Sequence, residues 1–414
     1  MTATRLRPGG LAAALPPGGL TLVSSSPAES DLLIDEVGAA GAALGDMAFS
    51  GVFVPGLNHA TWRAGPDSRV ITFFQTPELK REGARSRFLP LCYQDILRFL
   101  RQERPAAALF MCSPPDDHGN CSFGAEASFI AALWREIPVR IAHINPLMPR
   151  TPGDTGMPFA QLTAWFEGTQ DLRTMVSGQD TVSHAIAAQI APLIPNGATL
   201  QTGLGKIPDA VLRALGQHEG LRLHSGLIGD GALALVQSGA MAEGPSALVG
   251  VAIGSAELYA GLAHPHFQFR PVTVTHDPAT LAAIDRLVTI NSAIAVDLYG
   301  QVHAEASARG FMSGPGGAGD YARGARTGAD GLRIVALPAT AGAVSRIVPA
   351  SAGHGPVYLS RFDVDLVVTE NGIADLRNLD HEARARALIA IAAPAHREYL
   401  SRTWRDAMTA LQEP

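Results

Sequence analysis

The sequence has few cysteines, few charged residues and no long uninterrupted apolar stretch. Only 3 of its 414 residues are cysteine, too few for a disulfide framework, and no CxxC pair indicates zinc. The 32 lysines and arginines are outnumbered by 38 aspartates and glutamates, without a long basic run, which argues against nucleic-acid binding. No stretch approaches the roughly 18 uncharged residues that a membrane span needs. These absences predict a reduced, cytoplasmic protein without nucleic-acid or membrane partners.

Apolar residues and turn formers are abundant instead. Hydrophobic residues make up 47% of the chain and charged residues 17%, a balance that allows large buried cores and is unlike that of a disordered chain. The 43 glycines and 29 prolines are spread along the chain and indicate many tight turns. At roughly 150 residues per domain, the length suggests two or three domains.

Short β-type runs alternate with helix-length segments almost throughout, and the pattern restarts near residue 180. Near-continuous apolar strands alternating with helices are typical of a mainly parallel sheet covered on both faces. We therefore predict an α/β protein with two open, mainly parallel-sheet domains, residues 1–180 and 181–414. The expected strands are Met47–Val54, Val70–Phe74, Ala107–Cys112, Val139–Ile144, Ala198–Thr202, Leu221–His224, Ala247–Ile253, Leu287–Ile290, Leu332–Leu337 and Val364–Thr369.

Two glycine-rich loops are candidates for a ligand site. Residues 203–208 read Gly-Leu-Gly-Lys-Ile-Pro between a strand and a helix, where backbone N–H groups and the helix N-terminus favour an anion. The loop is neither GxGxxG nor a Walker loop, and a plain turn explains it equally well. Residues 314–320 form the densest glycine cluster, for which a flexible surface loop is the alternative. The polar residues Asn291, Ser292 and Asp297 inside an apolar stretch favour a function.

Other polar segments after expected strands have simple structural explanations. Residues 113–119 and 145–150 suit rigid turns first and binding or acid–base roles second. His224 and Ser225 are neighbours on a strand and point to opposite faces, which argues against a catalytic pair. Glu370 ends a strand and offers either a carboxylate or a turn cap. No HExxH, GxSxG or metal-spaced cluster occurs, so we predict no metal site.

Six segments, in order along the chain, carry a recognisable set of motifs. They are Ser113–Gly119, Asn145–Arg150, Thr199–Pro208, Ile290–Val302, Gly314–Asp320 and Val367–Leu376. Together they resemble the acetyl-CoA hydrolase/transferase family, which includes the 4-hydroxybutyrate and succinyl-CoA:acetate CoA-transferases. The resemblance covers the chain from about residue 45 to the C-terminus. It implies two α/β domains of the CoA-transferase type, with acyl-CoA and a small carboxylic acid as substrates.

The resemblance also implies a ping-pong mechanism with a glutamate nucleophile. In the family, the glutamate attacks an acyl-CoA thioester, the resulting anhydride becomes a glutamyl-CoA thioester, and an incoming carboxylate resolves it. By motif position, Asn291 and the backbone amides of Gly316 and Gly317 would stabilise the oxyanions. Coenzyme A, as a substrate, would lie along Gly203, Leu204, Gly205, Lys206, Ile207, Gly314, Gly316 and Gly317.

The residue that should carry this mechanism is absent. The family's glutamate belongs to an HTE segment downstream of the first glycine loop, and here residues 224–226 read His-Ser-Gly. Gly226 has no carboxylate and cannot attack a thioester. Ala295 and Val344 also depart from the usual glutamate and lysine. The candidates for a replacement nucleophile are Asp230, Glu370 or a glutamate of the N-terminal domain across the cleft.

Three functions are compatible with the absence of the family's glutamate. We favour an acyl-CoA:carboxylate CoA-transferase with an atypical or relocated nucleophile, acting on a short-chain acyl-CoA such as acetyl-, butyryl- or succinyl-CoA. The alternatives are an acyl-CoA hydrolase without a covalent step and a non-catalytic acyl-CoA-binding pseudoenzyme. All three retain a pocket for coenzyme A. The high apolar content leaves room for a homodimer or a partner subunit.

Overall fold

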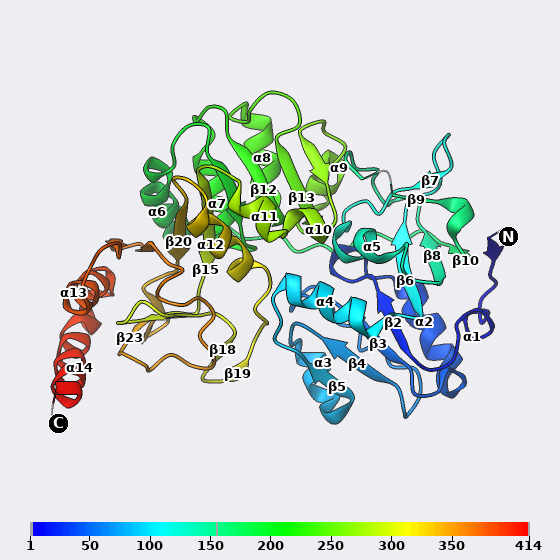
Figure 1. Cartoon of the computed structure of the whole chain (residues 1–414), viewed down its shortest axis with the longest axis horizontal. Coiled ribbons are helices and arrows are strands. Elements are labelled where there is room, and N and C mark those ends of the chain that lie inside the picture. Colours follow the sequence, from blue (N-terminus) through cyan, green and yellow to red (C-terminus); the bar gives the residue numbers. More distant parts are fainter. Residues whose placement is uncertain (1–2, 155, 413–414) are drawn as a thin grey trace.

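The first half of the chain forms a parallel sheet. The structure is a computed structural model that describes residues 3–154 and 156–412, and within these ranges it contains two eight-stranded sheets (Figure 1). In the first sheet every neighbouring pair is parallel. Its order is β1 (Thr4–Arg5), β10 (Ala164–Glu167), β8 (Val139–Ile144), β6 (Ala107–Cys112), β2 (Leu20–Val23), β3 (Ala48–Gly51), β4 (Arg69–Thr72) and β5 (Ser86–Phe88).

The second half forms a similar sheet with one antiparallel edge. All its neighbouring pairs are parallel except the last, which is a hairpin. Its order is β14 (Phe267–Phe269), β13 (Ala247–Ala252), β12 (Arg222–Ile228), β11 (Thr199–Thr202), β15 (Leu287–Ser292), β20 (Leu332–Ala336), β24 (Leu366–Thr369) and β25 (Gly372–Asp375). The predicted α/β class with mainly parallel sheets is therefore confirmed.

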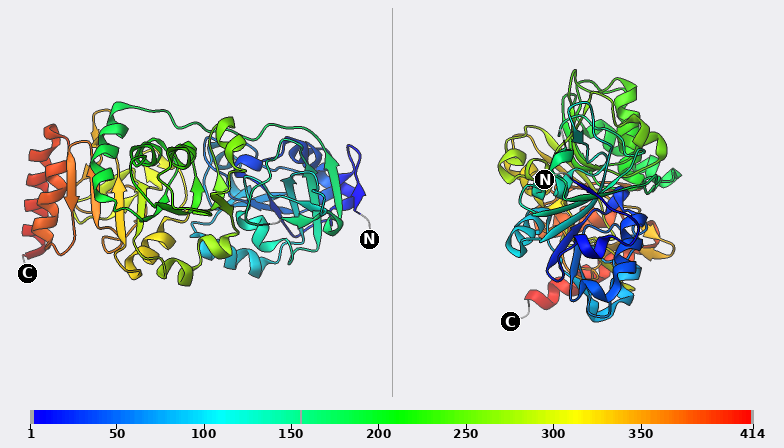
Figure 2. Two further views of the ribbon diagram at one scale, coloured as in Figure 1. Left: turned by 90° about the horizontal axis from the view of Figure 1, so that it is seen from above. Right: turned by 90° about the vertical axis from the view of Figure 1, so that its right-hand side faces the viewer.

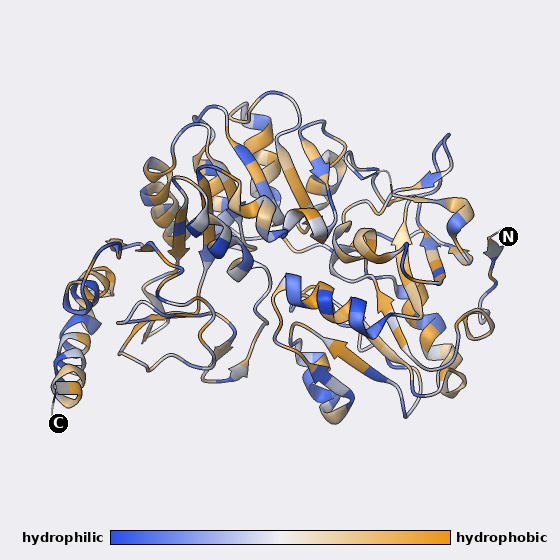
Figure 3. Ribbon diagram, viewed as in Figure 1, coloured by the Kyte–Doolittle hydropathy of each residue, from blue (hydrophilic) through white to orange (hydrophobic). Residues whose placement is uncertain are grey.

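Helices cover the sheets; amphipathic ones such as α4 bury one face, whereas α5 and α7 are buried over most of their length. Central strands such as β6 and β13 are largely apolar, whereas helices such as α4 and α14 mix apolar and polar residues (Figure 3). The main helices are α2 (Asp31–Ala40), α4 (Tyr93–Glu103), α5 (Ser128–Leu133), α6 (Thr181–Ile190), α7 (Lys206–Ala214), α8 (Asp230–Ser238), α9 (Ala256–Gly261), α10 (Val272–Thr275), α11 (Pro278–Ala282), α12 (Ala318–Thr327), α13 (His381–Ile391) and α14 (Pro394–Gln412).

Short elements complete the described chain. The helices are α1 (Leu11–Ala14) and α3 (Pro77–Arg81), and the short strands are β7 (Asn120–Cys121), β9 (Met157–Pro158), β16 (Ala295–Asp297), β17 (Val302–His303), β18 (Ala306–Ser307), β19 (Gly310–Phe311), β21 (Thr340–Ala341), β22 (Val344–Ser345) and β23 (Ile347–Val348). The two ends of the described chain lie at opposite ends of the long axis (Figure 2). None of the described helices has the length and apolar composition required to cross a membrane.

The predicted strands all form and differ from the observed ones mainly at their ends, whereas six strands of the two sheets (β1, β2, β5, β10, β14 and β25) were not predicted. The strand expected at Leu221–His224 continues to Ile228, because β12 stays paired with β13 along that length. Gly226 therefore lies inside a strand rather than in a loop. The helix expected at Asp209 begins at Lys206, directly after Gly205, whose φ of 125° is inaccessible to a helix. The described chain ends in two helices rather than one, since Pro394 starts a new helix after α13.

Segments of the first half pack directly against the second sheet. Glu126 forms an antiparallel β-bridge with Val251 of β13, and Gly153 forms a parallel one with Phe269 of β14. The largest buried apolar cluster also contains side chains from both sheets. The predicted boundary at residues 180 and 181 falls between the last strand of the first sheet and the first strand of the second, and it stays a prediction.

Candidate active site

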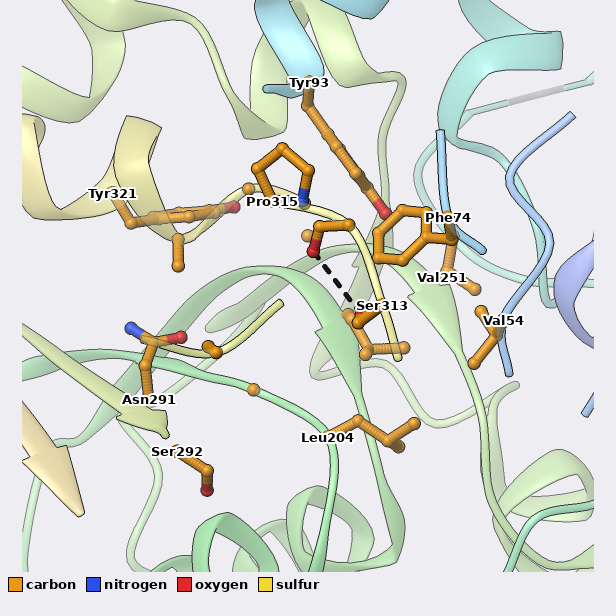
Figure 4. A pocket seen from close by; sticks show the side chains of 18 of the residues that line it. Val54, Phe74, Tyr93, Leu204, Val251, Asn291, Ser292, Ser313, Pro315 and Tyr321 are labelled. Carbon is orange, nitrogen blue, oxygen red and sulfur yellow. Dashed lines mark hydrogen bonds between the residues drawn. The ribbon is translucent and has the colours of Figure 1, made fainter. Parts of the chain in front are cut away.

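A cavity of about 270 Å³ lies where strands of both sheets end (Figure 4). In the second sheet it is lined by the carboxyl-terminal parts of β11, β12, β13 and β15. The first half contributes residues that follow β2, β3 and β4 and the first residue of α4. The loop before α12 closes another side. The residues that line it include Val54, Phe74, Tyr93, Gln201, Gly203, Leu204, Gly226, Val251, His276, Asn291, Gly314, Gly316, Gly317 and Tyr321.

Several predicted site residues meet at this cavity although they are far apart in sequence. Its wall includes Gly203, Leu204, Asn291, Gly226 and the glycine loop at 314–317. That loop runs close to the first sheet: a Cβ on Gly314 would collide with the backbone of Phe73. Glycine is thus required there by close approach. The second glycine loop therefore lies between the two halves of the molecule.

Three predicted coenzyme A contacts lie off the cavity wall. Gly205 precedes α7, and Ile207 is buried in its first turn. The Lys206 ammonium is 3.1 Å from Asp180 Oδ2 at the surface. An exposed pair of this kind contributes little to stability, about 0–1 kcal/mol. Lys206 is therefore available to a ligand only outside the cavity.

The structure does not bring Asp230 or Glu370 to the cavity. Asp230 Oδ1 accepts hydrogen bonds from the backbone N–H and the hydroxyl of Ser255, at 3.0 and 2.7 Å, and so supports the start of α9. Glu370 Oε2 accepts a hydrogen bond from the Ala339 N–H at 2.8 Å. Both carboxylates are occupied by backbone groups away from the wall. Neither has the position that a replacement nucleophile needs.

A reciprocal amide pair forms part of the wall, and the sequence analysis did not anticipate its second member. Asn291 Nδ2 donates to Gln201 Oε1 at 3.0 Å, and Gln201 Nε2 donates to Asn291 Oδ1 at 3.2 Å. Both side chains are about 95% buried, with 5% and 4% of their surface exposed. They face each other because β11 and β15 are neighbours in the sheet. Each side-chain amide has a second N–H that this pairing does not use. The pairing therefore fixes the orientation of an N–H group that can donate to an oxyanion.

His276 also lies on the cavity wall, and no sequence motif pointed to it. It ends α10, and only 1% of its surface is exposed. Its ring packs on Tyr93, with centroids 4.5 Å apart, and meets Tyr321 edge to face at 4.9 Å. Its Nδ1 is 2.9 Å from the Thr275 hydroxyl. Burial, assisted by nearby His224, lowers the pKa of His276 to about 3. The imidazole is therefore neutral near pH 7.

The His276 ring occupies the space beside Gly226. A Cβ built on Gly226 would lie 2.7 Å from His276 Nε2 and closer still to Cε1. A Cβ built on Gly317 would lie 2.8 Å from Cδ2 of the same ring. Real Cβ atoms essentially never approach so closely. Two glycines and one imidazole thus fit together, and a larger residue at position 226 would require the ring to move.

The cavity wall is electrically neutral. Among the described residues, no aspartate, glutamate, lysine or arginine lines it. Three carboxyl groups lie near the wall without forming part of it: Glu305 is buried, and Glu126 and Asp320 are half-buried. Burial raises the pKa of Glu126 and of Glu305 above the ordinary value, and it raises the pKa of Asp320 to about 6. Glu126 accepts a hydrogen bond from the Ser25 N–H at 3.1 Å.

Comparison with known proteins identifies the family. Residues 254–404 match the acetyl-CoA hydrolase/transferase C-terminal domain. Over 330 residues, 77% of each chain, the sequence is 36% identical to the 4-hydroxybutyrate coenzyme A transferase of Clostridium kluyveri. The chain belongs to the acetyl-CoA hydrolase/transferase family. The resemblance drawn from the six motifs is confirmed.

Further members of the acetyl-CoA hydrolase/transferase family agree with this assignment. The chain is 34% identical over 351 residues to the succinyl-CoA:acetate/propanoyl-CoA:succinate CoA transferase of Fasciola hepatica, covering 81% of this chain and 73% of that one. The structure of RipA from Yersinia pestis superposes with a TM-score of 0.90 and 26% identity over 98% of each chain. The expectation of an enzyme of the CoA-transferase and acetyl-CoA hydrolase class is thereby confirmed. The correspondence of Gly226 to the family's glutamate stays a prediction.

Proposed function

We propose that the protein is a CoA-transferase that moves coenzyme A from a short-chain acyl-CoA to a small carboxylic acid. The observation that carries this proposal is the convergence of separate motifs on one cavity. Gly203, Asn291, Gly226 and residues 314–317 belong to four distant segments, yet all line it. Family relatives whose names specify CoA transfer support the same chemistry.

The cavity is suited to the reacting end of an acyl-CoA. Its volume of about 270 Å³ lies just below the roughly 300–1,000 Å³ of pockets that enclose whole drug-sized ligands. It therefore suits the acyl group and the thioester, with the nucleotide end outside, along residues 205–207. The donors for an oxyanion are the Asn291 amide and the backbone N–H groups of Ala318 and Gly319, which precede the first hydrogen bonds of α12, made by Asp320 and Tyr321 to the Gly317 carbonyl.

The neutral cavity wall indicates which acyl groups the cavity accepts. Val54, Phe74, Leu204 and Val251 supply apolar surface, and no described cation faces the cavity. Burying a second, non-reacting carboxylate without a partner would cost several kcal/mol. An acyl group without that extra charge, such as acetyl or butyryl, therefore fits better than succinyl.

Product analysis tests the proposal. Purified protein is incubated with acetyl-CoA and butyrate, and thioesters are identified by mass spectrometry. Formation of butyryl-CoA supports the transferase. Acetate and free thiol without butyryl-CoA indicate a hydrolase, and calorimetric binding of acetyl-CoA without any product indicates a pseudoenzyme. Absence of binding contradicts all three. Asn291→Ala is the matched control, and its rate should fall if the product arises in this cavity.

A further inference from the structure

The cavity lacks the nucleophile that a covalent transfer mechanism needs. None of the described residues on its wall carries a carboxylate. Asp230 and Glu370 bind backbone groups elsewhere. The position predicted for the family's glutamate is a glycine beside which a buried ring already fills the space. A transferase built this way must obtain its attacking carboxylate from another source.

The imidazole that fills this space is firmly held. Tyr93 covers one face of the His276 ring, and the ring meets Tyr321 edge to face. The Thr275 hydroxyl contacts Nδ1, and Gln94 Nε2 donates to the His276 carbonyl at 2.6 Å. These contacts fix the backbone, the ring plane and the ring edge. Consequently, His276 is a permanent part of the wall rather than a side chain that swings away to admit another group.

We infer that the acceptor acid itself attacks the acyl-CoA thioester, in a ternary complex, without a covalent enzyme intermediate. The inference rests on the proposed CoA transfer and specifies its mechanism. Its basis is that the acceptor acid carries a carboxylate, the functional group that the cavity wall lacks. The neutral, largely apolar surroundings leave such a carboxylate poorly solvated and hence reactive, while the Asn291 amide lies on the same wall to receive the oxyanion.

The two steps balance without any enzyme group entering a bond. In the first, an acceptor carboxylate oxygen bonds to the thioester carbonyl carbon, the C–S bond breaks, and CoA leaves as a thiolate with the electron pair. The product is a mixed anhydride of the two acids. In the second, the thiolate sulfur bonds to the acceptor's carbonyl carbon, and the C–O bond to that carbon breaks. The donor acid leaves as a carboxylate that carries one oxygen from the acceptor, and no net proton is transferred.

Three other nucleophiles would lead to different products or intermediates. A nearby glutamate such as Glu126 or Glu305, if it reached the thioester, would form an anhydride and then a CoA thioester on the enzyme. His276 Nε2 would form an acyl-imidazole. Water would give only hydrolysis. These routes differ from direct attack in the origin of the oxygen in the released acid or in the appearance of a protein adduct.

A single-turnover experiment with labelled acceptor distinguishes these routes. Protein in excess is mixed with acetyl-CoA and butyrate labelled with ¹⁸O in both carboxylate oxygens, then quenched in acid. Acetate, butyryl-CoA and the intact protein are analysed by mass spectrometry. Direct attack predicts butyryl-CoA together with acetate that carries one ¹⁸O, and an unmodified protein. A glutamate nucleophile would instead give unlabelled acetate in this first turnover, because its own oxygen leaves with the acetate.

Failure of the inference and failure of the proposed function give different results. Butyryl-CoA with unlabelled acetate, or an adduct on any residue including His276, overturns direct attack but leaves CoA transfer intact. No butyryl-CoA at all overturns the transfer function itself. As controls, Glu126→Gln and Glu305→Gln should each keep the ¹⁸O label in acetate, and loss of the label or of the product in either would identify a relocated carboxylate.

Steady-state kinetics provide an independent check. Initial rates are measured against acetyl-CoA at several fixed butyrate concentrations. Direct attack needs both substrates bound together, so double-reciprocal lines should intersect. Parallel lines would show that one product leaves before the second substrate binds, which contradicts the ternary complex.

Discussion

Residues 226 and 276 should behave as one packing unit, and a double variant can restore a carboxylate to the cavity. In Gly226→Glu alone, the new Cβ lies within 2.7 Å of His276 Nε2. Overpacking of a well-packed core costs about 1–3 kcal/mol, so this variant should lose about that much unfolding free energy. Gly226→Ala introduces the same Cβ without the carboxylate and should be destabilised for the same reason. Gly226 has no positive φ, so backbone strain does not contribute.

Removing the ring should relieve the clash. In a His276→Ala background, Gly226→Glu should cost much less, giving a favourable coupling energy of about 0.5–3 kcal/mol in a double-mutant cycle. Urea unfolding of the wild type, both single variants and the double variant measures this coupling. A cycle without coupling, or Gly226→Glu as stable as the wild type, would refute the packing argument.

The same double variant tests the chemistry. Gly226→Glu/His276→Ala places a carboxylate on the wall beside Asn291, and it should form a glutamyl adduct with acetyl-CoA, detected by intact mass and removed by hydroxylamine. Its first-turnover acetate should lose the ¹⁸O label. Gly226→Ala/His276→Ala has similar packing but no carboxylate and should form no adduct. An adduct in this control would show that another residue had reacted.

Four further outcomes are expected. The lowered pKa of His276 means that the unfolded chain binds a proton between about pH 6.5 and pH 3 while the folded chain does not. The His276 contribution to the unfolding free energy should therefore fall by about 2 kcal/mol from about pH 7.5 to about pH 5, measured by urea unfolding as the difference between the pH dependence of the wild type and that of His276→Gln. Asn291→Ala should reduce kcat about 10²–10³-fold in the butyryl-CoA assay, the usual effect of losing an oxyanion donor. Asp230→Ala should lose about 1 kcal/mol of stability through its hydrogen bonds to Ser255 but keep kcat, and a large fall in kcat would place it back in the site. Competition between butyryl-CoA and succinyl-CoA should favour butyryl-CoA in kcat/KM by at least about tenfold, as burial of one unpaired charge implies.

The sequence by itself determined the α/β class, because continuous apolar strands and amphipathic helices are local patterns. The strands predicted at residues 107–112 and 139–144 match β6 and β8 in both bounds. Six strands of the two large sheets, β1, β2, β5, β10, β14 and β25, were not predicted, because each has only two to four residues and carries no clear periodic signal. The glycine loops and Asn291 were identified because their motifs are contiguous in sequence, as was the absence of a carboxylate at Gly226.

Only the tertiary structure decided what surrounds these motifs. The sequence offered Asp230 and Glu370 as nucleophiles, but side-chain direction and backbone hydrogen bonds place both away from the cavity. It gave no signal for His276, since an isolated histidine after a short helix belongs to no motif. The ring meets Gly226 and Gly317 only because distant segments cross at the ends of the strands. Contacts of this kind depend on how the chain packs in space, which a pattern of neighbouring residues does not encode.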